Sequence, residues 1–256
     1  MASKFLPVFV GNALGDNEDL LPAFAAGKGG LKDALRFCQN FRIAGIGSLL
    51  LSGMAARLHE CLHASARAFL FFARGPEGAR ILTSRVAPFF DAVACGDEEA
   101  ARELSRLSPA TFDKEREYEE DFLFMRFLMD HFFLGANAQD AQALLSRYEK
   151  CLEGSVDPRL QVCQALFSVD GDAFDAGLTQ MMEAREVRYR KLAEKESEEE
   201  EVLATEGYVS IEGIALARLA VRAGLQPQED YLFVPSTALE PPRLRYRVDS
   251  WKHLML

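Results

Sequence analysis

Apolar side chains recur every three or four residues along most of the chain, which is the spacing of one face of an α-helix. The stretch 166–235 shows this pattern most clearly. A helix is predicted to begin at Asp172, because a carboxylate after the turn Asp170-Gly171 is able to accept hydrogen bonds from the free N–H groups of the next turn. Arg185 interrupts its apolar stripe, which consists of Phe174, Leu178, Met181, Tyr189 and Leu192. The stripe predicts a helix with one face in a core.

A second helix in this stretch is apolar on almost all sides. It is predicted to begin after Ser210 and to end before Gly224 and Pro227, which both favour helix termination. Its only charged residues are Glu212, Arg218 and Arg222. We therefore expect this helix to be buried on most sides, at the centre of the fold.

Further helices are predicted on both sides of this stretch. The first thirty residues are rich in Gly, Pro, Asn and Asp, so residues 1–30 are expected to form an extended lead-in with at most one helical turn. Gly45, Gly47 and Gly53 suit the close packing of two helices. The predicted helical spans are Leu31–Ala73 as two helices divided near Gly45–Ser48, Asp97 to Pro109, Phe112–Phe133, Ala141–Leu152 and Arg159–Phe167.

Similar turns separate these helices. Gly96-Asp97 and Gly171-Asp172 each follow an apolar helix end, and Gly135 in Leu134–Asn137 is a looser instance. Recurring helix–turn–helix units without a strict period predict antiparallel helix pairs packed as a solenoid-like bundle. The one alternating run, Arg243–Val248, predicts a lone strand or an extended tail. We predict an all-α fold with at most one short C-terminal strand.

One domain is expected to span residues 1–256, because 49% of the residues are hydrophobic and a chain of this length is able to bury a substantial core. Neither a signal peptide nor a membrane span is predicted, since Phe5–Val10 and Ile43–Ala56 are both too short. The predicted parts are the lead-in 1–30, N-terminal helices 31–74, a helical core 81–239 and a tail 240–256.

The charge balance narrows the classes of partner. The chain has 39 acidic and 29 basic residues and a formal net charge of −10. This charge argues against a general nucleic-acid binder and against adhesion to an anionic membrane, and leaves a basic protein partner open. The five cysteines contain no C-x-x-C pair, so they indicate buried thiols in a reducing cytoplasm rather than disulfides or a thiolate zinc site.

One motif has the form of a metal site. His59-Glu60-Cys61-Leu62-His63 matches H-E-x-x-H on a predicted helix, where two histidines four residues apart lie on one face and are able to bind Zn²⁺ while the glutamate activates water. Glu77 is the only nearby carboxylate for a third ligand, and no third histidine follows at the metzincin spacing. A zinc-dependent hydrolase is therefore one alternative. The other interpretation is a helix face with two ordinary, partly exposed histidines.

Acidic residues cluster in two places. The larger group contains Glu194, Glu196, Glu198, Glu199, Glu200 and Glu201, and the smaller group, Glu115 to Asp121, includes Glu115 and Glu119. Such a run is often a solvated helix end or a mobile loop. The functional interpretation is a negative surface that attracts a basic partner and occupies a site meant for phosphate.

Several of these segments, taken in order, resemble the immunity proteins of bacterial polymorphic toxin systems, specifically immunity protein family forty-nine. The resemblance covers Ile81 to Leu239. It rests on the helix end at Gly96-Asp97, the aromatic helix around Tyr118–Phe133, the segments Leu166–Asp172 and Met181–Tyr189, the helix start Gly207-Tyr208-Val209-Ser210, and the exit from Gly224-Leu225 to Asp230-Tyr231 and Val234-Pro235.

This resemblance implies an all-helical cytoplasmic protein that binds and neutralises one cognate toxin, with no catalysis and no cofactor of its own. It implies no particular toxin and no particular binding residues, so the two acidic groups are our candidate partner-binding site. A toxin that acts on nucleic acid, with a basic groove, suits the net charge. A general helical-repeat scaffold that binds short peptides is the remaining alternative.

Overall fold

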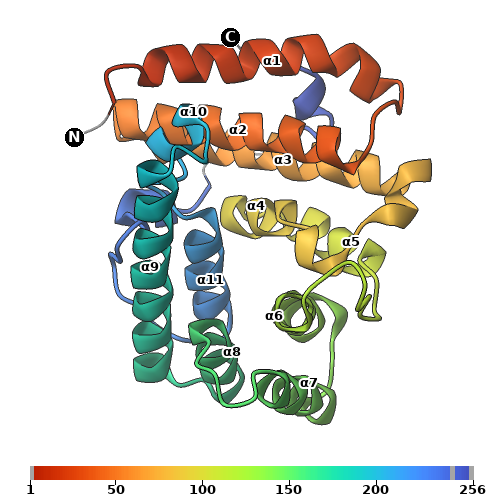
Figure 1. Cartoon of the computed structure of the whole chain (residues 1–256), viewed down its shortest axis with the longest axis vertical. Coiled ribbons are helices and arrows are strands. Elements are labelled where there is room, and N and C mark those ends of the chain that lie inside the picture. The colour runs from red at the N-terminus through yellow and green to blue at the C-terminus, as the bar shows by residue number, and fades with distance from the viewer. Residues whose placement is uncertain (1–2, 243–245, 254–256) are drawn as a thin grey trace.

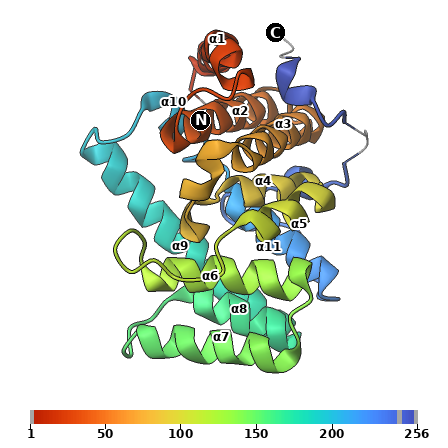
Figure 2. The same ribbon diagram turned by 90° about the vertical axis from the view of Figure 1, so that its right-hand side faces the viewer.

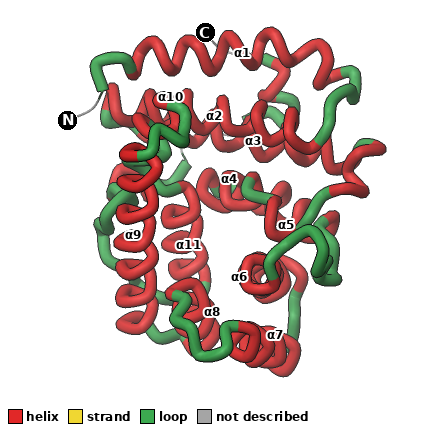
Figure 3. Tube along the Cα trace, viewed as in Figure 1, coloured by secondary structure: helices red, strands yellow, loops and turns green. Residues whose placement is uncertain are grey.

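The computed structural model describes residues 3–242 and 246–253, and its α-helices account for the architecture (Figures 1 and 3). They are α1 (Leu6–Ala25), α2 (Leu31–Ser52), α3 (Ala55–Arg74), α4 (Pro88–Cys95), α5 (Glu98–Leu107), α6 (Glu119–Met129), α7 (Ala138–Cys151), α8 (Pro158–Ser168), α9 (Gly171–Glu194), α10 (Glu200–Ala204) and α11 (Ile211–Arg222). Within these residues the only β-type pairing is an isolated bridge between Tyr231 and Val234. The predicted all-α class is confirmed.

Neighbouring helices in the sequence are mostly neighbours in space. Helices α1, α2 and α3 lie side by side across one end of the molecule, α4 packs on α3, and α6, α7 and α8 form the other end (Figures 1 and 2). Helix α11 packs against both α4 and α9, and so joins the two ends. One hydrophobic cluster runs from Leu14 on α1 to Trp251 near the C-terminus.

Helix α11 is the buried helix that the sequence predicts. Ser210 caps it by accepting a hydrogen bond from the amide of Gly213. Its buried residues are Ile211, Gly213, Ile214, Ala215, Leu216, Ala217, Leu219 and Ala220. Because these residues occupy most of its circumference, α11 is stabilised mainly by burial of apolar surface.

The predicted extended lead-in is wrong, since most of it is α1. Pro7 lies in the first turn, where the missing N–H of proline costs nothing. Gly11 has open space around it and does not break the helix. The stripe Leu6, Phe9, Ala13, Leu14 and Phe24 is buried. Asn17 is also buried and donates a hydrogen bond to the carbonyl of Phe37, which fixes α1 on α2.

The break between α2 and α3 lies later than predicted. It falls at Gly53, which ends α2 in a left-handed conformation, and not at Gly45–Ser48. Gly45 and Gly47 instead lie inside α2 at close contacts: a Cβ on Gly45 would lie 2.9 Å from Cβ of Cys61, and one on Gly47 would lie 2.5 Å from Cγ2 of Val10. The prediction of close helix packing is therefore correct for Gly45 and Gly47, although they do not divide the helix. It is wrong for Gly53, which has open space around it.

Two other helix starts differ from the prediction. The helix expected from Phe112 begins only at Glu119, because residues 112–118 form a loop in which Glu117 accepts hydrogen bonds from the amides of Ser84 and Asp113. The helix expected from Asp172 begins at Gly171, and Asp170 is the residue whose side chain caps it.

The C-terminal segment contains no strand among its described residues. Part of the predicted alternating run, residues 243–245, lies outside the described residues, and Tyr246 and Arg247 are irregular. A short 3₁₀ turn follows at Ser250–Lys252 and buries Trp251. None of the helices in the described ranges has the length and apolar character needed to cross a membrane.

Candidate functional site

The two histidines of the H-E-x-x-H motif are buried on α3. His59 is 2% exposed and His63 is 5% exposed, so the expectation of partly exposed side chains is wrong. Nε2 of His59 lies 3.1 Å from the carbonyl oxygen of Ala238, and burial lowers the pKa of this imidazole. After α11 the chain passes back over α3, and the segment around Ala238 covers His59. The residues next to His59 in the sequence do not predict this burial.

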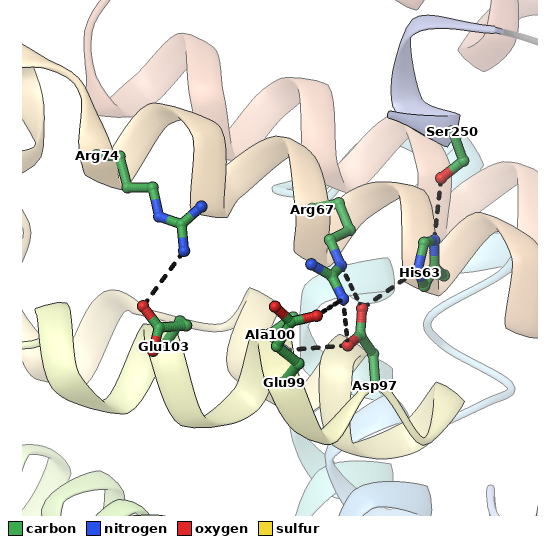
Figure 4. Close-up of polar contacts among 8 residues, drawn as sticks. All are labelled: His63, Arg67, Arg74, Asp97, Glu99, Ala100, Glu103 and Ser250. Atoms are coloured by element: carbon green, nitrogen blue, oxygen red, sulfur yellow. Dashed lines mark hydrogen bonds and ion pairs between the residues drawn. The ribbon is translucent and has the colours of Figure 1, made fainter. Parts of the chain in front are cut away.

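Both ring nitrogens of His63 have protein partners (Figure 4). Nδ1 lies 3.0 Å from Oγ of Ser250, and Nε2 lies 3.2 Å from Oδ2 of Asp97. Asp97 also accepts hydrogen bonds from Nε and Nη2 of Arg67 at 2.6 and 2.8 Å, and from the amide of Ala100, which makes it the cap of α5. Burial raises the pKa of Asp97, but the hydrogen bonds from His63, Arg67 and Ala100 outweigh it and lower this pKa to about 2.

The other residues of the zinc hypothesis are also engaged elsewhere. Glu60 forms an ion pair with Arg57 at 2.6 Å, and Glu77 forms one with Arg80 at 3.0 Å. Within residues 3–242 and 246–253, no group of three or more His, Cys, Asp or Glu side chains has an arrangement suited to a metal ion. The zinc-hydrolase alternative is therefore not supported, and the motif serves to connect α3 to α5 and to the C-terminal segment.

A buried carboxylate on α4 has a similar structural role. Asp91 is fully buried and accepts hydrogen bonds from Arg42 on α2 at 2.7 Å and from Ser65 on α3 at 2.5 Å. Burial raises its pKa, while Arg42 and Ser65 lower it in part. The only sequence signal for this site was one acidic residue within the apolar helix 88–95.

The larger acidic group lies where α9 ends and α10 begins (Figure 1). Glu194, Glu196, Glu199 and Glu200 are exposed, and Glu198 and Glu201 are partly exposed. Helix α10 packs on α1 and α2 through Val202 and Ala204. The acidic run is thus attached to the body of the protein at its C-terminal end.

Arg36 on α2 connects this group to α1. It forms one ion pair with Glu199 and another with Asp16 on α1, whose Oδ2 lies 3.4 Å from Nη2. We call the surface formed by Asp16 and the six glutamates Glu194, Glu196 and Glu198 to Glu201 the acidic corner. The place of Asp16 in this surface was not predictable from the sequence, since α1 was not predicted as a helix.

The smaller acidic group lies elsewhere. Glu115 is exposed in the loop before α6, and Glu119 begins α6 and forms an ion pair with Arg147 on α7 at 2.7 Å. This loop is separated from α10 in both views of the chain (Figures 1 and 2). The two acidic groups therefore do not form one continuous surface.

The comparison with protein families gives a match over most of the chain. The model described as Immunity protein 49 matches residues 48–238. No curated protein and no solved structure matches the chain. The family match begins within α2 and includes all of α3, whereas the residue pattern placed the start of the resemblance at Ile81. The buried connection from His63 to Asp97 therefore lies within the matched region.

Proposed function

The chain belongs to the Immunity protein 49 family, and from this premise we propose that it binds one cognate toxin and neutralises it by blocking the toxin's active site. The family match over residues 48–238 is the observation that carries this proposal. An immunity protein of this kind acts by association, so its surface performs the function and no catalytic group is required.

The acidic corner is the surface we assign to the toxin. Its glutamates are exposed or partly exposed. Among the described residues, Arg36 pairs with one of these glutamates, Glu199, and the same guanidinium also pairs with Asp16. The corner therefore keeps a large negative charge. Such a surface complements the basic groove of a toxin that acts on nucleic acid, and it accelerates association by electrostatic steering.

Exposed apolar side chains at the start of α1, the helix that carries Asp16, supply candidate anchors. Phe5 and Val8 at the start of α1 are 46% and 54% exposed. Their neighbours Leu6 and Phe9 belong to the small hydrophobic cluster that also includes Val202 of α10. Since a few buried apolar anchors dominate most protein interfaces, we propose that Phe5 and Val8 contribute affinity while the glutamates contribute association rate.

We place this activity in the cytoplasm. All five cysteines are free, and four of them are buried. Burial raises the pKa of Cys38 and of Cys61 to about 12, which keeps both as unreactive thiols. These properties suit a reducing compartment.

The test is to add increasing amounts of the purified chain to the candidate toxin, the product of the neighbouring gene, and to measure the toxin's remaining activity. Stoichiometric inhibition is expected, with activity lost at one equivalent and a stable complex in size-exclusion chromatography. Inhibition at a small fraction of one equivalent would indicate enzymatic inactivation and would contradict the proposal. Absence of any complex, together with binding of unrelated short peptides, would favour a general helical scaffold instead.

A further inference from the structure

A pocket of about 550 Å³ opens between the end of α1, the end of α3 and the C-terminal segment. Its apolar part is formed by Phe24, Phe71 and Trp251, together with Leu70 and Phe72. The three rings contact one another, with centroid separations of 5.9, 5.5 and 4.9 Å. Pockets of this size with aromatic walls are typical of binding sites.

The charges at the rim of this pocket differ in sign from the protein as a whole. Four basic residues, Lys28, Arg67, Arg74 and Lys252, line it, against Glu77 and Asp249. Both of these acids form ion pairs, Glu77 with Arg80 and Asp249 with Arg247.

Among residues 3–242 and 246–253, two of these four cations have no acidic partner. Arg67 is paired with Asp97 and Glu99, and Arg74 with Glu103. In the part of the chain that the structure describes, Lys28 and Lys252 have no ion pair. Nζ of Lys252 lies 5.0 Å from the ring centroid of Trp251 and 5.8 Å from that of Phe71, so its charge is held directly beside the apolar wall.

The pocket is not a feature of the matched region alone. Helix α3 lies within residues 48–238, but Phe24 and Lys28 precede this range and Trp251 and Lys252 follow it. Two segments outside the matched residues therefore close onto a helix within them. The pocket therefore combines residues inside and outside the matched region.

We propose that this pocket binds a polypeptide segment of the toxin in which an aromatic side chain is flanked by carboxylates. The aromatic ring packs on the wall that Phe71 and Trp251 form together, and the carboxylates pair with Lys28 and Lys252. This inference extends the proposed function, because it assigns a second contact, of opposite charge, at the other end of α1 from the acidic corner. An aromatic anchor in a desolvated pocket is the usual centre of binding energy at an interface.

The single tryptophan allows a direct test, since Trp251 lies in the pocket and its fluorescence reports occupancy. The full chain is titrated with acetylated and amidated heptapeptides of glycine and serine with a central Asp-Phe-Asp, Lys-Phe-Lys or Asp-Ala-Asp. We expect a saturable change in emission with Asp-Phe-Asp, and affinity at least about tenfold weaker for the other two.

A charge-reversal variant provides the second arm. Lys28→Glu combined with Lys252→Glu is expected to weaken Asp-Phe-Asp binding about tenfold or more, whereas Lys150→Glu, at an exposed lysine on α7, leaves it unchanged. Circular dichroism establishes that each variant is folded. Equal binding of Lys-Phe-Lys, or no saturable change with any peptide, overturns the proposal. Phenylacetate that binds as tightly as the peptide overturns it in favour of a small aromatic acid.

This titration requires no toxin, so its outcome is separate from that of the proposed function. If Asp-Phe-Asp binds and the toxin does not, the pocket exists but the immunity assignment fails. If the toxin binds and Asp-Phe-Asp does not, the assignment holds and this pocket is not the second contact.

Discussion

Nε2 of His63 on α3 lies 3.2 Å from Oδ2 of Asp97 at the start of α5, so the second histidine of an apparent metal motif connects two helices. The same carboxylate accepts hydrogen bonds from Arg67 and from the first turn of α5. One side chain therefore joins three elements: α3, α5 and, through His63 and Ser250, the C-terminal segment.

The low pKa of Asp97 predicts a specific dependence of stability on pH. Its pKa in the folded protein is about 2, against an ordinary value of 3.8, so the folded state binds fewer protons than the unfolded state between these values. The carboxylate therefore stabilises the protein above about pH 4, and this contribution is lost as the pH falls through 2. We expect Asp97→Asn to lower the free energy of unfolding at pH 7 by about 2 kcal/mol.

Urea unfolding at pH 7 and at pH 2 measures this contribution. The difference between the wild type and Asp97→Asn is expected to shrink toward zero at the lower pH. Glu183→Gln, at an exposed carboxylate in the middle of α9, serves as the control and leaves stability unchanged. A difference that is the same at both pH values would mean that the ionised carboxylate does not supply the stability.

Two helical glycines, Gly45 in α2 and Gly11 in α1, predict opposite effects for the same substitution. At Gly45 a Cβ would lie 2.9 Å from Cβ of Cys61 and 3.3 Å from the backbone of Leu58, so Gly45→Ala must push α2 and α3 apart. We expect a loss of about 1–3 kcal/mol in the free energy of unfolding. Gly11→Ala, in open space on α1, is expected to stabilise by about 0.5–1 kcal/mol. Thermal melts that rank the two variants in the reverse order would contradict this packing.

Val169 has an unfavourable backbone conformation. Its φ of 56° places it in the left-handed region, where a β-branched side chain is strained, and its side chain is 54% exposed. Val169→Gly removes the strain but increases the freedom of the unfolded chain, so a net gain of about 0.5–1 kcal/mol is expected in chemical denaturation. Val156→Gly, at an exposed valine without a positive φ, is the matched control. Equal effects at the two positions would show that strain is not relieved.

Because His59 and His63 make structural contacts, we predict that the stability of the protein does not depend on zinc. Treatment with EDTA is expected to leave the melting temperature unchanged, because each imidazole is held by protein groups. Elemental analysis of the protein before and after the substitution His59→Ala checks this directly. One equivalent of zinc that is lost in the variant would restore the hydrolase hypothesis.

The sequence predicted the features that depend on local pattern. The apolar circumference of α11 and the cap at Ser210 are recognisable from residues within one helix. The glycines of α2 were predicted to allow close packing, but the same residues suggested a break there. Local propensity did not distinguish these outcomes, because Gly53 and not Gly45 has the space and the conformation of a helix end.

Features that depend on tertiary contacts were not predictable in the same way. Helix α1 was missed because its prolines and glycines outweighed a stripe that is stabilised by packing on α2 and α10, which are distant in sequence or not visible in the local pattern. The burial of His59 arises from the carbonyl of Ala238, 179 residues later in the chain. The run of glutamates in the acidic corner was recognisable in the sequence. Its connection through Arg36 to Asp16 was not, because that connection depends on how α1, α2 and α10 pack together.

The most direct test of the central claim is the rate of association with the toxin at low salt. The wild type is compared with a variant carrying Glu198→Ser, Glu199→Ser, Glu200→Ser and Glu201→Ser. The control carries the same change in net charge at exposed positions elsewhere, Glu149→Ser, Glu153→Ser, Glu183→Ser and Glu229→Ser. We expect the association rate constant to fall about tenfold or more for the first variant, with a weaker dependence on salt, and to change little for the control. Equal rates for the wild type and the acidic-corner variant would contradict the account.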